Sequence, residues 1–461
     1  MTRFTLYIMA ICLSVMLAGS VFAADDATLR PIIEVQQATL PNGAQIWVNH
    51  DSRLPVISIS LTLLRGGAYP DAPEKAGQTQ LLAQMLTEGA GKLNSQEFQA
   101  QLDNDGIQLD FVSDRDNFFG SLYTATDHAT MAFALLNDAL NTPHLQGQDL
   151  ARNRAAMLSR LRQNMGQPEW KIARLVNATV FADHPYGQNI GGTLDSLPRI
   201  TAQDLRQALA VRRNPAQLRI SFAGDITLEQ ARIVTQHLTQ TWPAQNVPAS
   251  VPALPHTTFP AKTVLHPLDI PQSFIAVTMP GINHADPDYA AAQVMAHILG
   301  GGFGSRLTQT LREENGLTYG VTADMTDRDA APSFDITLST KNEAAGNVLT
   351  LIAQITTGLC DAPPSEDELR DAQSYLIHSL PMHFASFRNT SAQMNAMQAA
   401  GLPLSYMVDH LRDIAAVTQA DVQRVSRRIL CSKTGPTRLL VGQPAQVKPD
   451  QTVTALPGFT N

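Results

Sequence analysis

Apolar and polar side chains alternate along residues 56–64, VISISLTLL, which is the pattern of a strand with one face in a core. Just upstream, Leu40-Pro-Asn-Gly43 has turn residues between two extended segments. Further on the spacing becomes helical, and we expect helices at 76–87, at 95–105 with a stop at Gly106, and at 148–165 before Pro168. This part of the chain is therefore predicted to mix strands and helices.

The same patterns return in the second half of the chain. QLLAQML at 80–86 resembles QVMAHIL at 293–299 at an offset of 213, and Asp-Arg-Asp occurs at 114–116 and again at 327–329. ITAQDLRQAL at 200–209 parallels VTQADVQRVS at 417–426, and each is followed by a short apolar strand. Ser365 and Glu368 form a capping-box pattern that opens the counterpart of the 148–165 helix. We infer a duplicated domain.

A proline-rich stretch separates the two repeats. Residues 242–260, WPAQNVPASVPALPHTTFP, contain five prolines and little periodicity, which is typical of an extended linker. We therefore predict an N-terminal domain at 31–241, a linker at 242–262 and a C-terminal domain at 263–446.

The first 23 residues have the features of a secretory signal peptide. Arg3 supplies a positive charge, residues 4–17 are apolar, and Val21-Phe22-Ala23 has the character of a cleavage site. We expect a mature chain that starts near Ala24 and is periplasmic or secreted. No later apolar run approaches the roughly 20 residues that a membrane span needs, so no span is expected.

The charge balance narrows the range of partners. Without the signal peptide the chain has 32 basic and 41 acidic residues, a net charge near −9 with histidine neutral. A nucleic-acid partner favours a basic surface, so we predict none.

Two cysteines remain in the mature chain, Cys360 and Cys431. They can form one disulfide in an oxidising compartment, or they can be two buried free thiols, and sequence alone leaves both open. They are too few, and have the wrong spacing, for a structural zinc site.

Residues 39–77, TLPNGAQIWVNHDSRLPVISISLTLLRGGAYPDAPEKAG, resemble the opening of the pitrilysin/insulinase family of zinc metallopeptidases, in its bacterial branch similar to the mitochondrial processing peptidases. In that family the next helix carries His-X-X-Glu-His. Two histidines four residues apart bind zinc from one helical face, and the glutamate is the base for the metal-bound water. Here those positions are Gln80, Ala83 and Gln84. A neutral amide is a weak zinc ligand and alanine moves no proton.

The family's remaining acidic residues are replaced as well. In NRAAMLSRLRQNMGQP, residues 153–168, the resemblance places Asn153 at the position of a supporting glutamate and Arg160 at that of the third zinc ligand. An arginine there would repel Zn²⁺. We therefore predict that this chain binds no catalytic zinc. His184 in DHPYGQNIGGT is interpreted as a packing and turn residue, and His297, on an apolar helical face, as a hydrogen-bonded core histidine.

A second family motif is intact. Residues 299–325, LGGGFGSRLTQTLREENGLTYGVTADM, resemble the family's second-domain signature, a Gly-rich loop followed by a helix and a strand. The resemblance implies that Arg312 and Tyr319 hold substrate and stabilise the scissile carbonyl opposite the zinc, and that Gly300, Gly301 and Gly302 line the chamber. The alternative is an arginine favoured at a helix end and a tyrosine packed in a strand. A phosphate loop is not indicated, because Gly-Lys-Ser/Thr is missing.

The resemblance extends from near Ile33 to near Gln443 and implies an α+β fold of two duplicated domains, each a mostly antiparallel sheet covered by helices, in a clam-shell half. The leading hypothesis is a non-zinc subunit of a periplasmic heteromeric metallopeptidase. Arg312 and Tyr319 would then complete the site of a homologous zinc-bearing partner acting on peptides or unfolded polypeptides. The alternative is an inert peptide-binding or assembly scaffold. A self-sufficient peptidase would need metal ligands that the sequence does not offer.

Overall fold

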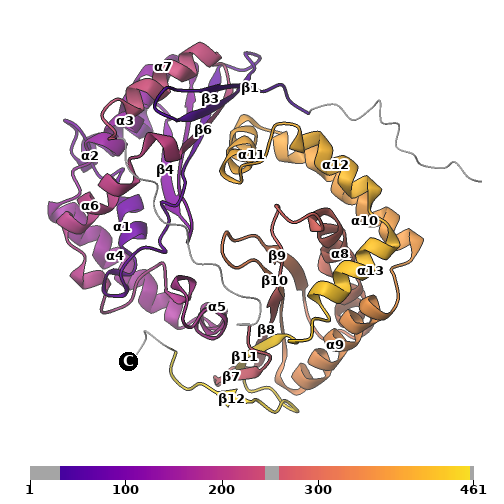
Figure 1. Cartoon of the computed structure of the whole chain (residues 1–461). Helices are drawn as coiled ribbons and strands as arrows, with labels where there is room; N and C mark the ends of the chain where they lie inside the picture. Colours follow the sequence, from indigo (N-terminus) through magenta and orange to yellow (C-terminus); the bar gives the residue numbers. More distant parts are fainter. Residues whose placement is uncertain (1–31, 244–258, 457–461) are drawn as a thin grey trace, which may run out of the picture.

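The computed structural model describes residues 32–243 and 259–456, which form two six-stranded sheets with helices around them (Figure 1). The predicted signal peptide and most of the predicted linker lie outside the described residues. The first sheet has the order β1-β2-β6-β3-β5-β4. Its strands are β1 Gln36–Thr39, β2 Gln45–His50, β3 Val56–Leu63, β4 Gln108–Ser113, β5 Phe118–Ala125 and β6 Leu218–Gly224.

The second sheet repeats this plan in the order β12-β7-β11-β8-β10-β9. Its strands are β7 Thr263–Pro267, β8 Gln272–Pro280, β9 Val321–Thr326, β10 Ser333–Lys341, β11 Thr437–Gly442 and β12 Gln451–Thr452. Pairing is mostly antiparallel. The parallel pairs β2 with β6 and β7 with β11 are equivalent in the two sheets, and β12 adds a further parallel pair with β7. The shared strand order confirms the duplication, and the α+β fold class is confirmed with it.

Helices lie around both sheets, most of them on the outer faces (Figure 1). In the first half they are α1 Gln78–Met85, α2 Ser95–Asn104, α3 Ala129–Asn141, α4 Gly147–Met165, α5 Pro168–Val180, α6 Ala202–Arg212 and α7 Leu228–Thr239. In the second half they are α8 Tyr289–Gly300, α9 Ala345–Asp361, α10 Glu366–Ser379, α11 Phe387–Ala399, α12 Tyr406–Ala416 and α13 Gln419–Ile429, with a π-helix at Thr308–Glu314. No helix of the described ranges is long and apolar enough to cross a membrane.

Local sequence signals explain where several of these elements begin. The backbone N–H of Gly43, at a φ of +92°, donates to the Leu40 carbonyl at 2.8 Å and closes the turn between β1 and β2. The Ser365 side chain accepts from the N–H of Glu368, and the Glu368 carboxylate accepts from the N–H of Ser365. The predicted capping box is thus confirmed at the start of α10.

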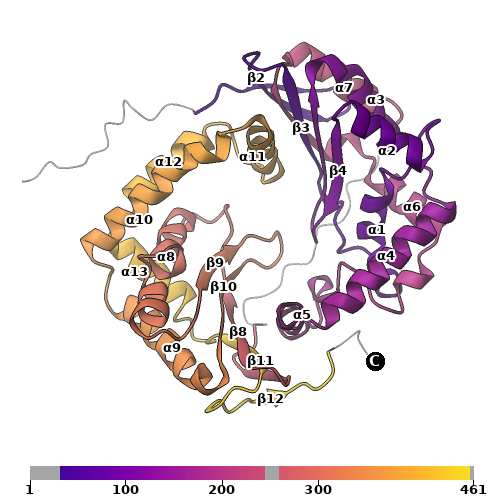
Figure 2. The same cartoon turned by 180° about the vertical axis from the view of Figure 1, so that it is seen from behind.

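Each half sends one helix across to the sheet of the other half. Helix α5 of the first half packs on β8 and β11, and α11 of the second half packs on β3 and β6. Both views of the molecule show α11 beside the first sheet and α5 beside the second (Figures 1 and 2). The inner faces of the two sheets are therefore covered by helices exchanged between the halves.

The contact of α11 with the first sheet is a buried polar seam, which we define as Ser58, Ser60, Thr62 and Ser221 on the sheet with Ser391, Asn395 and Gln398 on the helix. Ser391 Oγ lies 2.9 Å from both Ser58 Oγ and Ser60 Oγ. Thr62 donates to Asn395 Oδ1 at 2.5 Å, and Ser221 donates to Gln398 Oε1 at 2.7 Å. The hydroxyls of the sheet thus find their partners on a helix that lies more than 150 residues away in sequence.

The two Asp-Arg-Asp triplets form the tips of the β4–β5 and β9–β10 hairpins, and these tips meet at Tyr186. The Tyr186 hydroxyl donates to the Asp116 carboxylate and accepts from the backbone N–H of Ala330, so it bridges the two halves. Burial raises the pKa of Asp116 to about 6, helped by the nearby charges of Asp329 and Asp114 and opposed by the hydrogen bond from Tyr186.

Candidate functional site

By the sequence resemblance, helix α1 is the counterpart of the family's zinc helix, and its residues at the corresponding positions have structural contacts. The Gln80 amide donates from Nε2 to the backbone carbonyl of Ser113, the last residue of the edge strand β4, at 2.7 Å. Ala83 is buried in the core of the first half. Gln84, one turn beyond Gln80, is half-buried. Gln80 therefore ties the helix to the end of the sheet edge.

Helix α4 packs against α1 and carries the two remaining positions. Asn153 donates from Nδ2 to the carbonyl of Asp149, one turn back in the same helix, at 3.1 Å. Arg160 is exposed. Two amides, an alanine, an asparagine and an arginine present no carboxylate, imidazole or thiolate, so these five residues do not fit a zinc ion. Within residues 32–243 and 259–456 no three His, Cys, Asp or Glu side chains are grouped to hold a metal.

The second motif begins at the end of α8, where close backbone contacts require glycine. A Cβ on Gly300 would lie 2.5 Å from Cβ of Ala323 on β9, and one on Gly301 would lie 2.5 Å from Nδ1 of His297. Gly301 and Gly302 are exposed. That the three glycines line a chamber remains a prediction.

The helix after this loop has π geometry over Thr308–Glu314. Such turns are rare and occur frequently at functional sites. Its last turn carries Arg312, whose side chain is 41% exposed. Nε lies 3.2 Å from Oε1 of the neighbouring Glu313, and the guanidinium lies over the ring of Phe303, 5.2 Å from its centroid. Arg312 thus stands at a helix end, as both interpretations of the sequence expect.

Tyr319 lies on the short connection between the π-helix and the edge strand β9, and it is 88% exposed. The interpretation of this tyrosine as a residue packed in a strand is therefore wrong. The adjacent Thr318 fixes the connection, because its hydroxyl lies 2.8 Å from the carbonyls of both Gly320 and Ser339. The backbone fixed by Thr318 thus presents Tyr319 to solvent, just after the π-helix that carries Arg312, although no hydrogen bond joins the two side chains within the described residues.

Sequence analysis missed two aromatic residues near this motif. Phe303 is 72% exposed although it is a large apolar side chain, and it shares a contact with Arg312. Tyr375 of α10 stacks on His297 with ring centroids 4.5 Å apart. His297 is thus half-buried in a ring stack instead of hydrogen-bonded in the core. The sequence offered a single signal for an exposed Phe303, which is that an aromatic residue stands among glycines at 300–304.

His184 has the structural role that its sequence context predicts. It is buried, its Nδ1 accepts from the backbone N–H of Tyr186 at 3.2 Å, and its ring packs edge-on against that of Tyr186. Both residues lie where the two halves of the molecule meet, since Tyr186 bridges the halves.

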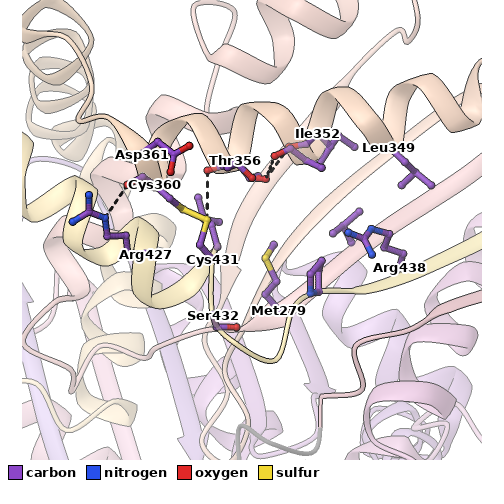
Figure 3. Close-up of a pocket in the computed structure, with 16 residues that line it drawn as sticks. Met279, Leu349, Ile352, Thr356, Cys360, Asp361, Arg427, Cys431, Ser432 and Arg438 are labelled. Atoms are coloured by element: carbon purple, nitrogen blue, oxygen red, sulfur yellow. Dashed lines mark hydrogen bonds between the residues drawn. A yellow bond between two sulfur atoms is a disulfide. The ribbon is translucent and has the colours of Figure 1, made fainter.

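A cavity on the outer side of the second half contains the two cysteines, which form a disulfide (Figure 3). Its volume is about 480 Å³, and Met279, Leu349 and Ile352 contribute apolar walls. Cys360 lies at the end of α9 and Cys431 just after α13. The alternative of two free thiols is therefore wrong. In the first half the equivalent helix ends are connected by a hydrogen bond. Arg213, just after α6, donates to the carbonyl of Asn141 at the end of α3, at 3.2 Å.

Comparisons with known proteins agree with this geometry. Residues 48–194 match the family model described as insulinase (peptidase family M16), and residues 199–376 match the model described as peptidase M16 inactive domain, so the two together span more than half of the chain. A protein of Helicobacter pylori named non-peptidase homolog YmxG is 25% identical over 84% of this chain and 89% of its own length. An uncharacterized zinc protease of Streptomyces coelicolor is 24% identical over 86% of this chain and 87% of its own length.

Among solved structures, a crystal structure from Pseudomonas fluorescens titled peptidase M16 inactive domain aligns with a TM-score of 0.83 and 25% identity, over 90% of this chain and 100% of that one. The family assignment rests on the two family models, on relatives that match most of the chain and on the shared fold. The chain belongs to the insulinase family of peptidases, M16, as a member that lacks the His-X-X-Glu-His zinc motif.

Proposed function

We propose that this protein is the non-zinc subunit of a periplasmic, heteromeric metallopeptidase. A homologous partner with an intact His-X-X-Glu-His would bind the zinc ion, and this chain would supply Arg312 and Tyr319 to the shared site. The signal-peptide features of residues 1–23 support the location.

The observation that carries the proposal is the presentation of Tyr319. A tyrosine that is 88% exposed on an anchored backbone buries almost none of its ring in this chain, so its own fold gains little from it. Its hydroxyl and the exposed guanidinium of Arg312 are donors suited to a carbonyl oxygen that becomes negative during peptide hydrolysis. Donors held in place before the reaction lower the barrier without reorganisation.

The edge strands of the two sheets support the substrate class that we propose. Both sheets end in an edge strand, β4 in the first and β9 in the second. An extended peptide can pair with such an edge through backbone hydrogen bonds, which gives a loose sequence preference. Peptides or unfolded polypeptides are therefore the substrates that we propose.

The test uses the full chain, alone and mixed with a homologue that contains His-X-X-Glu-His, and measures zinc content and peptide cleavage. Cleavage should appear only in the mixture, and Arg312→Ala or Tyr319→Phe should lower kcat by about a hundredfold. The matched controls are Arg370→Ala and Tyr375→Phe, both exposed on α10, which should leave the rate unchanged. Full activity of the mixture with both motif substitutions would contradict the proposal.

A second candidate function is a peptide-binding or assembly scaffold without a part in catalysis. The relative named as a non-peptidase homolog favours it. In that case the chain should bind the homologue or a peptide in an affinity measurement, while the rate of cleavage stays the same with and without it.

A further inference from the structure

The inner face of the second sheet contains an open groove beside α5. Its volume is about 620 Å³, and β8, β9, β10 and α5 form its walls. Helix α5 contributes mainly the apolar Ile172, Ala173 and Val176. The sheet contributes polar side chains as well as apolar ones such as Phe274 and Leu338.

Three of these polar residues form a row across neighbouring strands. In the strand register Asp324 of β9 stands directly opposite Asp335 of β10, which stands directly opposite Thr278 of β8. Side chains paired in this way lie on one face with Cβ atoms about 5 Å apart, and like charges there destabilise the sheet. Repulsion between the two carboxylates therefore destabilises the sheet, and a bound cation would remove this repulsion.

The row is incompletely satisfied by the chain itself. Asp335 accepts hydrogen bonds from Thr326 at 2.9 Å and from Ser333 at 2.6 Å. The side chain of Asp324, which is exposed, has no hydrogen bond or ion pair with residues 32–243 and 259–456. The Thr278 hydroxyl, in a residue only 1% exposed, also lacks a hydrogen-bond partner there, although it lines the groove. A buried polar group without a partner is unusual and calls for a ligand or water.

The other charged residues of the groove do not neutralise the pair. Arg115 donates from Nε to the Tyr186 carbonyl, and Arg328 donates to Ser333 and lies over the Phe181 ring. Neither forms an ion pair with Asp324 or Asp335 in the described part of the chain, and Glu169 adds a third negative charge. Burial, and then the charge of Asp335, raise the pKa of Asp324, as expected for carboxylates without a cation.

In the first sheet helix α11 covers part of the same row, and the rest of the row is exposed. Asp110, Ser121, Ser60 and Ser221 face one another across β4, β5, β3 and β6. Of these, Ser60 and Ser221 bind side chains of α11 in the buried polar seam, and only one member is acidic. The second sheet has two acids and a hydrophobic helix at the equivalent place.

We infer that the groove of the second half binds a basic side chain, lysine or arginine, of a peptide ligand. Its ammonium or guanidinium group would donate to Asp324 and Asp335, and the Thr278 hydroxyl would accept a further hydrogen bond. The apolar wall of α5 would contact the methylene stem of the same side chain. This inference rests on peptide binding by the proposed function, in either its subunit or its scaffold form.

The test measures binding by the full chain alone, without a zinc-bearing partner. Fluorescence anisotropy compares a short labelled peptide that has a central lysine with a twin that has norleucine, which keeps the apolar stem and removes the charge. The lysine peptide should bind about tenfold more tightly. Asp324→Asn with Asp335→Asn should abolish that difference, and Asp110→Asn, in the equivalent row of the first half, should preserve it.

Two results would overturn the inference: equal binding of the two peptides, including no binding of either, or an unchanged lysine preference in the double variant. Asp324→Asn alone, at an exposed position, keeps the test decisive if the double variant does not fold. Because the assay needs no cleavage, loss of activity in the mixed-subunit experiment and loss of lysine preference are separate outcomes.

Discussion

The two halves share a strand order but differ in how their inner faces are completed. In the first half polar sheet residues meet polar residues of α11, so the hydroxyls of the seam are satisfied. In the second half the apolar side of α5 lies beside two carboxylates and a threonine whose hydroxyl has no hydrogen-bond partner among the described residues. The difference teaches that duplication preserved the frame while the contents of the inner faces diverged, with a helix that supplies polar partners on one face and mainly apolar contacts on the other.

The halves differ again in how the end of one outer helix is fastened. Cys360 and Cys431 join the ends of α9 and α13 covalently, whereas a hydrogen bond from Arg213 to Asn141 connects the equivalent ends. The largest expected effect therefore comes from breaking the covalent link. Replacing both cysteines by serine should lower the free energy of unfolding by about 4 kcal/mol, since the closed loop spans 71 residues in sequence.

Arg213→Ala is the matched change in the first half and should cost only about 1 kcal/mol. Denaturant melts of both variants, with and without reductant, measure the two values. Equal losses of unfolding free energy in the two variants would show that the disulfide and the hydrogen bond contribute equally to stability.

The polar seam gives the next effect. Asn395→Leu on α11 leaves the buried hydroxyl of Thr62 and the part-buried carbonyl of Arg219 without their partner. The expected loss is about 3 kcal/mol. Asn389→Leu, on the exposed side of the same helix, is the control and should change stability by less than about 0.5 kcal/mol. A neutral Asn395→Leu would mean that the seam does not hold the halves together.

The junction at Tyr186 predicts a pH effect. The pKa of Asp116 is about 6 in the folded chain against an ordinary 3.8. Because the folded value is raised, protonation favours the fold, and this stabilising contribution is lost as pH rises through about 6. Asp116→Asn should therefore raise the free energy of unfolding at pH 8 by about 2 kcal/mol.

Below about pH 4 that gain should disappear, because Asp116 is then protonated in both states. Thermal melts at several pH values measure it, with Asp103→Asn on the exposed side of α2 as the control. A gain of the same size at every pH would exclude the carboxylate charge as its cause.

The smallest effect concerns helix α1, which lacks the family's zinc ligands. Gln80→Ala removes the hydrogen bond to the end of β4 and should cost about 1 kcal/mol, whereas Gln84→Ala on the same helix should cost less. The counterpart of Gln80 in the second half, Gln293, instead accepts from His410 across to α12, with 2.6 Å between Oε1 and Nε2. If Gln80→Ala were neutral, a structural role for this glutamine would be wrong.

Local signals in the sequence predicted a large part of this fold. The alternation at 56–64, the capping box at Ser365 and the offset of 213 each depend on neighbours in sequence, and each reappears as a strand, a helix start and a repeated sheet. The family assignment followed from motifs of the same local kind.

Long-range contacts could not be predicted in this way. The polar stripe of α11 and the apolar side of α5 indicate buried faces, but nothing near them in the chain says that each faces the opposite sheet. The stack of His297 on Tyr375 joins residues 78 positions apart, and the exposure of Tyr319 depends on a loop fixed by Ser339. Pairing of the cysteines required a three-dimensional distance.

The crossing helices also determine when the molecule can be finished during its synthesis. The first sheet has all its strands once residue 224 has been made, yet the helix that covers its hydroxyls ends at residue 399. That helix lies inside the loop that the disulfide closes between residues 360 and 431. The inner face of the N-terminal half therefore stays exposed to water until nearly the whole polypeptide has been synthesised. A chain truncated after the first repeat lacks the helix that covers this face.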